Sequence, residues 1–179
     1  MNSNYNNDNL TDVNNIDLTK SPRAVKAMSL FHDGGYACAA STFLAFNDLV
    51  DMPFDQAAKL ASSFGAGMGR LREVCGALTG IFMAAGLLYG YADTTDAEEK
   101  TAHYVRIQAL SKRFREITSA MLGDDTIICR ELLHLDIKGA DDPRPQPRTE
   151  NYYATRPCEK LIGIGAYVLE EYMNENEAK

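Results

Sequence analysis

VCGALTGIFMAAGLLYGYA, residues 74–92, is a run of 19 residues without a charged side chain. Its apolar residues go all the way round a helical projection, which is typical of a helix that is buried on most sides. Gly76, Ala77 and Gly80 give it a small-residue face against which a second helix can lie close. We therefore expect a central helix from about residue 71 to residue 89, with the other elements packed around it.

The same run is close to the roughly 20 apolar residues that a membrane-spanning helix needs. It also has the GxxxG spacing of some membrane helices, at Gly76 and Gly80. Three features argue against a membrane span: the four glycines in the run, the lack of a basic cluster at either end, and neighbouring amphipathic segments that need an apolar partner. A buried core helix is the better interpretation, and no membrane association is expected.

The flanking sequence predicts further helices. Ser21-Pro22 is an N-cap followed by proline at the first helical position. Apolar residues at helical spacing then favour helices over residues 21–32, 36–52, 54–64 and 96–120, a short helix around Cys129 that Asp124 or Asp125 caps, and a last helix after a Thr155 cap. No strand alternation or internal repeat is present. The expected fold is an all-α, single-domain bundle of about six or seven helices around the central one.

Three segments fall outside this helical pattern. Residues 1–20 hold seven asparagines and predict a flexible N-terminal arm before a helical domain over residues 21–179. Residues 136–150 predict an exposed, Pro-rich loop. Residues 65–70, GAGMGR, lack the preceding strand and the third glycine of a dinucleotide-binding loop, so we expect a tight connection there.

The net charge of −7 argues against nucleic-acid binding, which requires a basic surface. The polar N-terminus has no apolar segment of the kind that a signal peptide contains. We therefore expect a cytoplasmic protein whose cysteines stay reduced. In that compartment cysteines more often bind metals, act in catalysis or are simply buried than form structural disulfides.

The four cysteines are far apart in sequence, at Cys38, Cys75, Cys129 and Cys158. No CxxC spacing is present, so spacing alone gives a weak metal signal. Each cysteine nevertheless lies near the N-terminal end of a predicted helix, where the helix dipole favours a thiolate. A single cysteine here is best explained as a small buried hydrophobic residue. Four at equivalent positions favour one shared site.

At these residues the chain resembles a family of redox-active proteins named for the pattern C_GCAxxG_C_C. The matching segments are residues 35–39 (GYACA), 64–70 (FGAGMGR), 74–80 (VCGALTG), 129–133 (CRELL) and 156–158 (RPC). In the third segment, cysteine and glycine stand in the opposite order to the family label. The resemblance implies a mostly helical domain with a four-cysteine redox or iron–sulfur-type centre.

Three hypotheses remain open at this point. In the first, Cys38, Cys75, Cys129 and Cys158 bind a metal or an iron–sulfur cluster for electron transfer, because four thiolates are a suitable ligand set. In the second, the same residues are metal-free redox thiols that form disulfides. In the third, the cysteines are inert in a helical interaction module.

The sequence also suggests the surroundings of such a centre. Arg70 and Arg72, and Arg156 beside Cys158, are candidates to hold a thiolate or an anionic partner. A redox hypothesis also requires a partner protein that exchanges electrons with the centre. The small-residue faces permit a homodimer.

Overall fold

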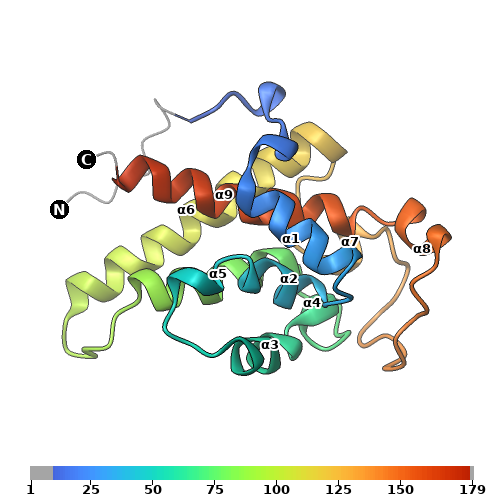
Figure 1. Cartoon of the computed structure of the whole chain (residues 1–179), viewed down its shortest axis with the longest axis horizontal. Coiled ribbons are helices and arrows are strands. Elements are labelled where there is room, and N and C mark those ends of the chain that lie inside the picture. Colours follow the sequence, from blue (N-terminus) through green and yellow to red (C-terminus); the bar gives the residue numbers. More distant parts are fainter. Residues whose placement is uncertain (1–9, 178–179) are drawn as a thin grey trace.

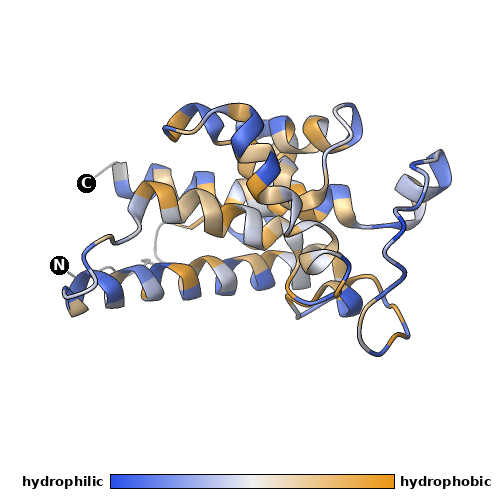
Figure 2. Cartoon of the chain, turned by 90° about the horizontal axis from the view of Figure 1, so that it is seen from below, coloured by the Kyte–Doolittle hydropathy of each residue, from blue (hydrophilic) through white to orange (hydrophobic). Residues whose placement is uncertain are grey.

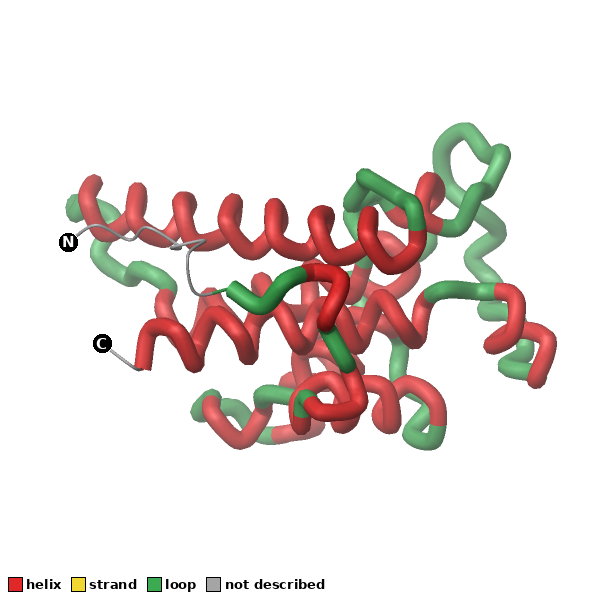
Figure 3. Tube along the Cα trace, turned by 90° about the horizontal axis from the view of Figure 1, so that it is seen from above, coloured by secondary structure: helices red, strands yellow, loops and turns green. Residues whose placement is uncertain are grey.

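The computed structural model describes residues 10–177 and confirms the all-α, single-domain fold (Figure 1). The described residues contain no strand (Figure 3), only an isolated antiparallel bridge between Val74 and Ile128. Six of the α-helices have seven residues or more. In chain order the elements are η2 (Val13–Asn15), η3 (Leu18–Lys20), α1 (Pro22–His32), α2 (Cys38–Leu44), η4 (Asn47–Leu49), α3 (Phe54–Ser62), α4 (Gly65–Met68), α5 (Gly76–Tyr89), α6 (Ala97–Leu122), α7 (Cys129–Leu132), α8 (Glu150–Thr155) and α9 (Cys158–Glu177).

Helix α5 is the predicted central helix. It packs against α2, α4, α6 and α9, and its first six residues are all buried. A Cβ atom on Gly80 would lie 2.6 Å from the carbonyl oxygen of Ala39 in α2, and one on Gly165 of α9 would lie 2.8 Å from that of Ala77. These two glycines therefore let α2 and α9 approach α5 backbone to backbone. None of the described helices is both long enough and apolar enough to cross a membrane.

The outer helices complete the core. Ser21 caps α1 as expected, because its hydroxyl accepts a hydrogen bond from the amide of Ala24. Helix α6 runs along one side of the molecule (Figure 3). The predicted inner face of the last helix is confirmed, since four residues at helical spacing in α9 are buried: Leu161, Ile164, Val168 and Tyr172. In Figure 2, α8 is mostly hydrophilic and lies at the edge of the molecule.

The helix expected over residues 36–52 is wrong in length, because α2 ends at Leu44. The chain tightens there, with the amide of Phe46 bonded to the carbonyl of Phe43. This turn buries every side chain from Phe43 to Phe46. Arg23 of α1 donates a 2.6 Å hydrogen bond to the carbonyl of Ala45, which satisfies the end of the helix.

Two other expectations also need correction. The central helix begins at Gly76 and not near residue 71, because Val74 pairs with Ile128 in extended conformation. The apolar spacing of residues 54–64 predicts that Leu60 shares a face with Ala57 and Ala61, but Leu60 is 46% exposed. The inner face of α3 consists of the smaller residues Ala57 and Ala61.

The predicted flexible arm over residues 1–20 stays a prediction, and its first nine residues lie outside the described part of the chain. So do residues 178–179 of the predicted helical domain. Within the described part, Thr11 accepts a hydrogen bond from Arg113, and its amide donates one to Glu171. Leu18 is buried in the core.

Candidate functional site

Each of the four cysteines stands at the start of a helix. Cys38, Cys129 and Cys158 are the first residues of α2, α7 and α9, and Cys75 is the N-cap of α5. The sequence predicted this placement. The predicted caps were wrong, because Ile128 precedes α7 and residue 155 ends α8.

Short backbone pairing brings Cys75 and Cys129 together. The amide of Cys75 donates to the carbonyl of Ile127 at 2.8 Å, and the amide of Cys129 donates to the carbonyl of Glu73 at 2.6 Å. Beside this pairing, the guanidinium of Arg130 makes two hydrogen bonds, of 2.8 and 3.0 Å, to the carboxylate of Glu73. The segments before α5 and α7 therefore deliver their cysteines side by side.

A left-handed segment connects these elements to Cys38. Ala66, Met68, Arg70 and Arg72 have φ values of 55°, 65°, 68° and 60°. Such backbone costs roughly 1–2 kcal/mol per non-glycine residue, and strain of this kind tends to persist at functional sites. The strained turn directs the amide of Ala66 at the Cys38 sulfur, with a nitrogen-to-sulfur distance of 3.3 Å.

The four cysteines line a single cavity of about 290 Å³. Cys75 and Cys129 are buried, Cys38 and Cys158 are half-buried, and all four are free thiols. The structure thus brings together the four residues that the sequence singled out. Among residues 10–177, however, no group of three or more cysteine, histidine or acidic side chains stands close enough to hold a metal ion.

The cavity disfavours thiolates. Burial, and next the charge of Cys38, raise the pKa of Cys75 well above that of an ordinary thiol. The same two causes raise the pKa of Cys158 to about 12. Burial also raises the pKa of Cys129, although the guanidinium of Arg72 opposes the shift. These three thiols are therefore protonated at neutral pH. Of the other cysteines, Cys38 contributes most to the raised pKa of each of them.

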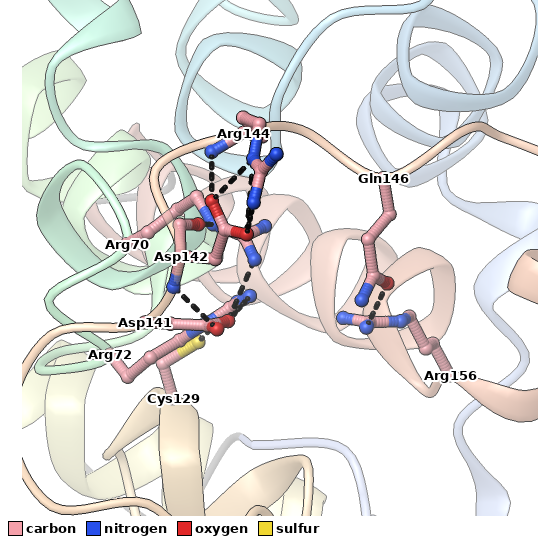
Figure 4. A network of polar contacts seen from close by, with 8 residues as sticks. All are labelled: Arg70, Arg72, Cys129, Asp141, Asp142, Arg144, Gln146 and Arg156. Atoms are coloured by element: carbon pink, nitrogen blue, oxygen red, sulfur yellow. Dashed lines mark hydrogen bonds and ion pairs between the residues drawn. The ribbon is translucent and has the colours of Figure 1, made fainter.

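Arg72 is a buried cation that lies beside the thiol of Cys129 (Figure 4). Its Nη1 lies 3.8 Å from the Sγ of Cys129, and its Nε and Nη2 donate to one carboxylate oxygen of Asp141, at 3.0 and 2.6 Å. Arg70 donates to the same oxygen at 2.8 Å. Arg70 and Arg72 were candidates from the sequence to hold a thiolate, and the structure places Arg72 at Cys129.

The Pro-rich segment contributes residues that the sequence did not identify. It is exposed along most of its length, as predicted, but it also folds over the cavity, which Pro143, Pro145, Gln146 and Arg148 help to line. Arg148 donates hydrogen bonds of 2.6 and 2.7 Å to the carbonyls of Phe31 and Tyr36. Composition alone gives no signal for this contact, because arginine is usual in an exposed loop.

Comparison with known proteins identifies the family of the chain. A family model described as "Putative redox-active protein (C_GCAxxG_C_C)" matches residues 36–172, which is more than half of the chain and includes all four cysteines. No curated protein and no solved structure matches the chain.

Proposed function

This chain belongs to the C_GCAxxG_C_C family of redox-active proteins, and from that premise we propose that its four cavity cysteines are the redox groups and act by dithiol–disulfide exchange. The observation that carries the proposal is the convergence of Cys38, Cys75, Cys129 and Cys158 on one cavity. Four helices that are separate in sequence each contribute one thiol to it, and inert buried cysteines would not need to meet in this way.

Exposure divides the thiols into two roles. Cys38 and Cys158 are half-buried and are the outer thiols, which a reactant meets first. Cys75 and Cys129 are buried and are the inner thiols. Cys38 is the outer thiol whose sulfur accepts a hydrogen bond from a backbone amide, that of Ala66, so we assign it the first attack.

The exchange conserves atoms and electrons. The thiolate of Cys38 attacks a partner disulfide, the partner S–S bond breaks, and one partner thiol leaves with a proton. A second cavity thiol attacks the resulting mixed disulfide, forms a disulfide within the protein and releases the second partner thiol. Two electrons and two protons pass from the protein to the partner. The partner, a protein or a small disulfide, is part of this proposal.

A metal or iron–sulfur centre is the second candidate, and the donor set favours it. Four soft thiols at helix N-termini, with Arg72 beside one of them, suit the negative charge of a thiolate-bound centre. Such a centre would be held by Cys38, Cys75, Cys129 and Cys158, and it would supply one-electron transfer. The spacing fits less well than the chemistry, because no three of the described donors stand as a metal-holding group.

Purification without oxygen separates the two candidates. Thiol-based exchange predicts colourless protein without bound iron or zinc, four titratable thiols, and the loss of two thiols per chain after exposure to a disulfide. Peptide mapping should then find Cys38 in the new disulfide, and a Cys38→Ser variant should form it far more slowly. Stoichiometric iron with a visible chromophore would support the metal-centre function instead of thiol exchange. Four thiols that stay unchanged under oxidant would overturn redox action by these residues.

A further inference from the structure

The wall of the thiol cavity is strongly basic in a chain whose net charge is −7. Four arginines line the cavity, and the described residues of its lining include no aspartate, glutamate, lysine or histidine. The arginines come from two segments, residues 70–72 and residues 148–156. A cleft lined with charges of one sign concentrates ligands of the opposite sign.

In the part of the chain that the structure describes, ion pairs neutralise only one of these four positive charges. Arg70 and Arg72 share the single carboxylate of Asp141, so that trio keeps one positive charge. Arg148 donates to two backbone carbonyls, and Arg156 donates to the side-chain amide of Gln146 at 2.6 Å. These acceptors are neutral. The four arginines and Asp141 together therefore carry a charge of about +3, from four positive charges and one negative.

We propose that the cavity takes small anionic disulfides as its oxidising substrates, in preference to neutral and cationic ones. This proposal deepens the thiol-exchange function and rests on it. A cavity of about 290 Å³ is close to the lower limit of roughly 300 Å³ for small-molecule sites. It is therefore too small to admit a folded protein, while it fits a low-molecular-weight disulfide that bears carboxylates.

Arg148 and Arg156 are the residues that carry the selectivity. Both are half-buried, whereas Arg72 is buried and is already engaged by Asp141. Arg156 also stacks on the ring of Tyr152, with its guanidinium carbon 4.8 Å from the ring centre, which holds the charge at the cavity wall. Since Arg156 lines the same cavity as Cys38 and Cys158, an anionic group bound at Arg156 brings its disulfide bond into the cavity that holds the outer thiols.

The reaction is the exchange described above, with the anionic disulfide as oxidant. One disulfide is reduced to two thiols, and two cavity thiols become one disulfide. Two electrons and two protons move to the substrate, so no metal or further reductant is required. The carboxylates of the substrate do not react and serve only in recognition.

Three disulfide probes of different charge test the proposal on the reduced full-length chain. Dithiobis(nitrobenzoate) is a dianion, dithiodipyridine is neutral, and cystamine is a dication. Each rate is divided by the rate of the same probe with the urea-unfolded chain, which removes differences in intrinsic reactivity. The normalised rate of the dianion should exceed that of the dication by about 10-fold or more at low salt, and high salt should reduce this ratio.

Arginine variants locate the effect. Arg148→Gln and Arg156→Gln should each slow the dianion by about threefold or more, and should slow the neutral probe clearly less than the dianion. Arg156→Lys, which keeps the charge, should restore most of the rate. The matched control is Arg115→Gln, since Arg115 pairs with Asp125 outside the cavity and its loss changes the net charge equally. Arg156 donates to the side-chain amide of Gln146, whereas Arg148 donates to two backbone carbonyls, so the Arg156 variant remains informative if Arg148→Gln unfolds.

The failures are distinguishable. Equal normalised rates for the three probes, or an equal effect of Arg115→Gln, would overturn anion selection and leave thiol exchange intact. A folded protein whose thiols react with none of the probes would overturn thiol exchange itself.

Discussion

The Sγ atom of Cys38 occupies the space that a Cβ atom on Gly76 would need. The first turn of α5 and the first residue of α2 thus meet backbone to sulfur, and only glycine at position 76 permits the contact. The family label places cysteine before alanine in this motif, whereas this chain has Cys75 one position earlier and Gly76 before Ala77. Because Gly76 has no side chain, the sulfur of Cys38 can lie against the backbone at position 76, next to Ala77.

Gly76→Ala should destabilise the protein by about 1–3 kcal/mol, as overpacking of a close contact does. The added Cβ would also lie 3.0 Å from the amide nitrogen of Ala39 and 3.2 Å from the carbonyl oxygen of Phe64. Urea unfolding measures the effect. In a Cys38→Ala background the same substitution should cost less, and the coupling between positions 38 and 76 should be about 0.5 kcal/mol or more.

Gly86→Ala is the control in the same helix. A Cβ on Gly86 would meet nothing within 4 Å, so alanine there should be neutral or stabilise the helix by up to about 1 kcal/mol. An equal change in stability at both positions would mean that the contact with Cys38 does not set the role of Gly76.

The helical pattern is local, and for that reason much of the fold can be predicted from the sequence. The Ser21 cap, the buried stripe of α9 and the uncharged central run each predict their own element, and the structure confirms all three. The convergence of the four cysteines could also be expected, because four helix starts with one thiol each form a shared pattern.

What escaped prediction depends on contacts between distant segments. Val74 leaves the helical pattern because Ile128 pairs with it, and Arg148 reaches the cavity because the carbonyls of Phe31 and Tyr36 accept its hydrogen bonds. The left-handed conformation of Ala66 and Arg72 is likewise imposed by its surroundings, since neither residue type favours positive φ.

Alkylation of Cys158 should stay slow and should rise about tenfold per pH unit between pH 7 and pH 10. The reason is that burial and Cys38 raise the pKa of the Cys158 thiol to about 12, and only the thiolate reacts. Peptide-level mass spectrometry after iodoacetamide pulses measures the rate. In urea the same cysteine should level off above about pH 9, as an ordinary thiol does.

Two variants should change that rate in opposite directions. Cys38→Ala removes a group that raises the pKa of Cys158 and should speed its alkylation, whereas Arg156→Gln removes one that lowers it and should slow it. Looser packing alone would speed both variants, so a faster reaction in Arg156→Gln would contradict the electrostatic account.

Glu171→Gln should destabilise the protein by about 3–5 kcal/mol, because it breaks a buried ion pair and removes from Arg113 a carboxylate at 2.9 Å. The side chains of Arg113 and Glu171 are only 4% and 8% exposed, and two hydrogen bonds of 2.9 and 3.0 Å join them. Urea unfolding gives the free energy. The amide of Thr11 should also exchange faster with solvent, since Glu171 accepts its hydrogen bond.

Glu116→Gln is the matched control, since Glu116 lies 3.7 Å from the same arginine but is 37% exposed. Its loss should cost less than about 0.5 kcal/mol, as is usual for exposed ion pairs. A similar cost at both glutamates would show that burial does not decide the strength of these pairs.

Asp141→Asn should destabilise the protein at neutral pH by about 2 kcal/mol, because Arg72 is buried and loses its charged acceptor. The hydrogen bond from Arg72 lowers the pKa of Asp141 in the folded state. A lowered folded-state pKa gives a stabilisation that is complete above the unfolded pKa and is lost as the pH falls through the folded one. The difference between wild type and variant should therefore be constant above about pH 5 and shrink below about pH 4.

Asp142→Asn is the control, because it removes the carboxylate partner of an exposed arginine, Arg144, in a pair that is screened by solvent. Its effect on stability should be close to zero at every pH, although Arg144 also lowers the pKa of Asp142. The comparison isolates burial of the cation, since both carboxylates face guanidinium groups at similar distances.

Arg72 has two roles, because the Asp141 carboxylate that holds its guanidinium beside the cavity also keeps its Nη1 near the sulfur of Cys129. Asp141→Asn should accordingly raise the pKa of the Cys129 thiol further if Arg72 moves away, and slow alkylation of Cys129 relative to the Asp142→Asn control. Faster alkylation of Cys129 in Asp141→Asn would show that freeing Arg72 from its carboxylate strengthens its hold on the thiolate.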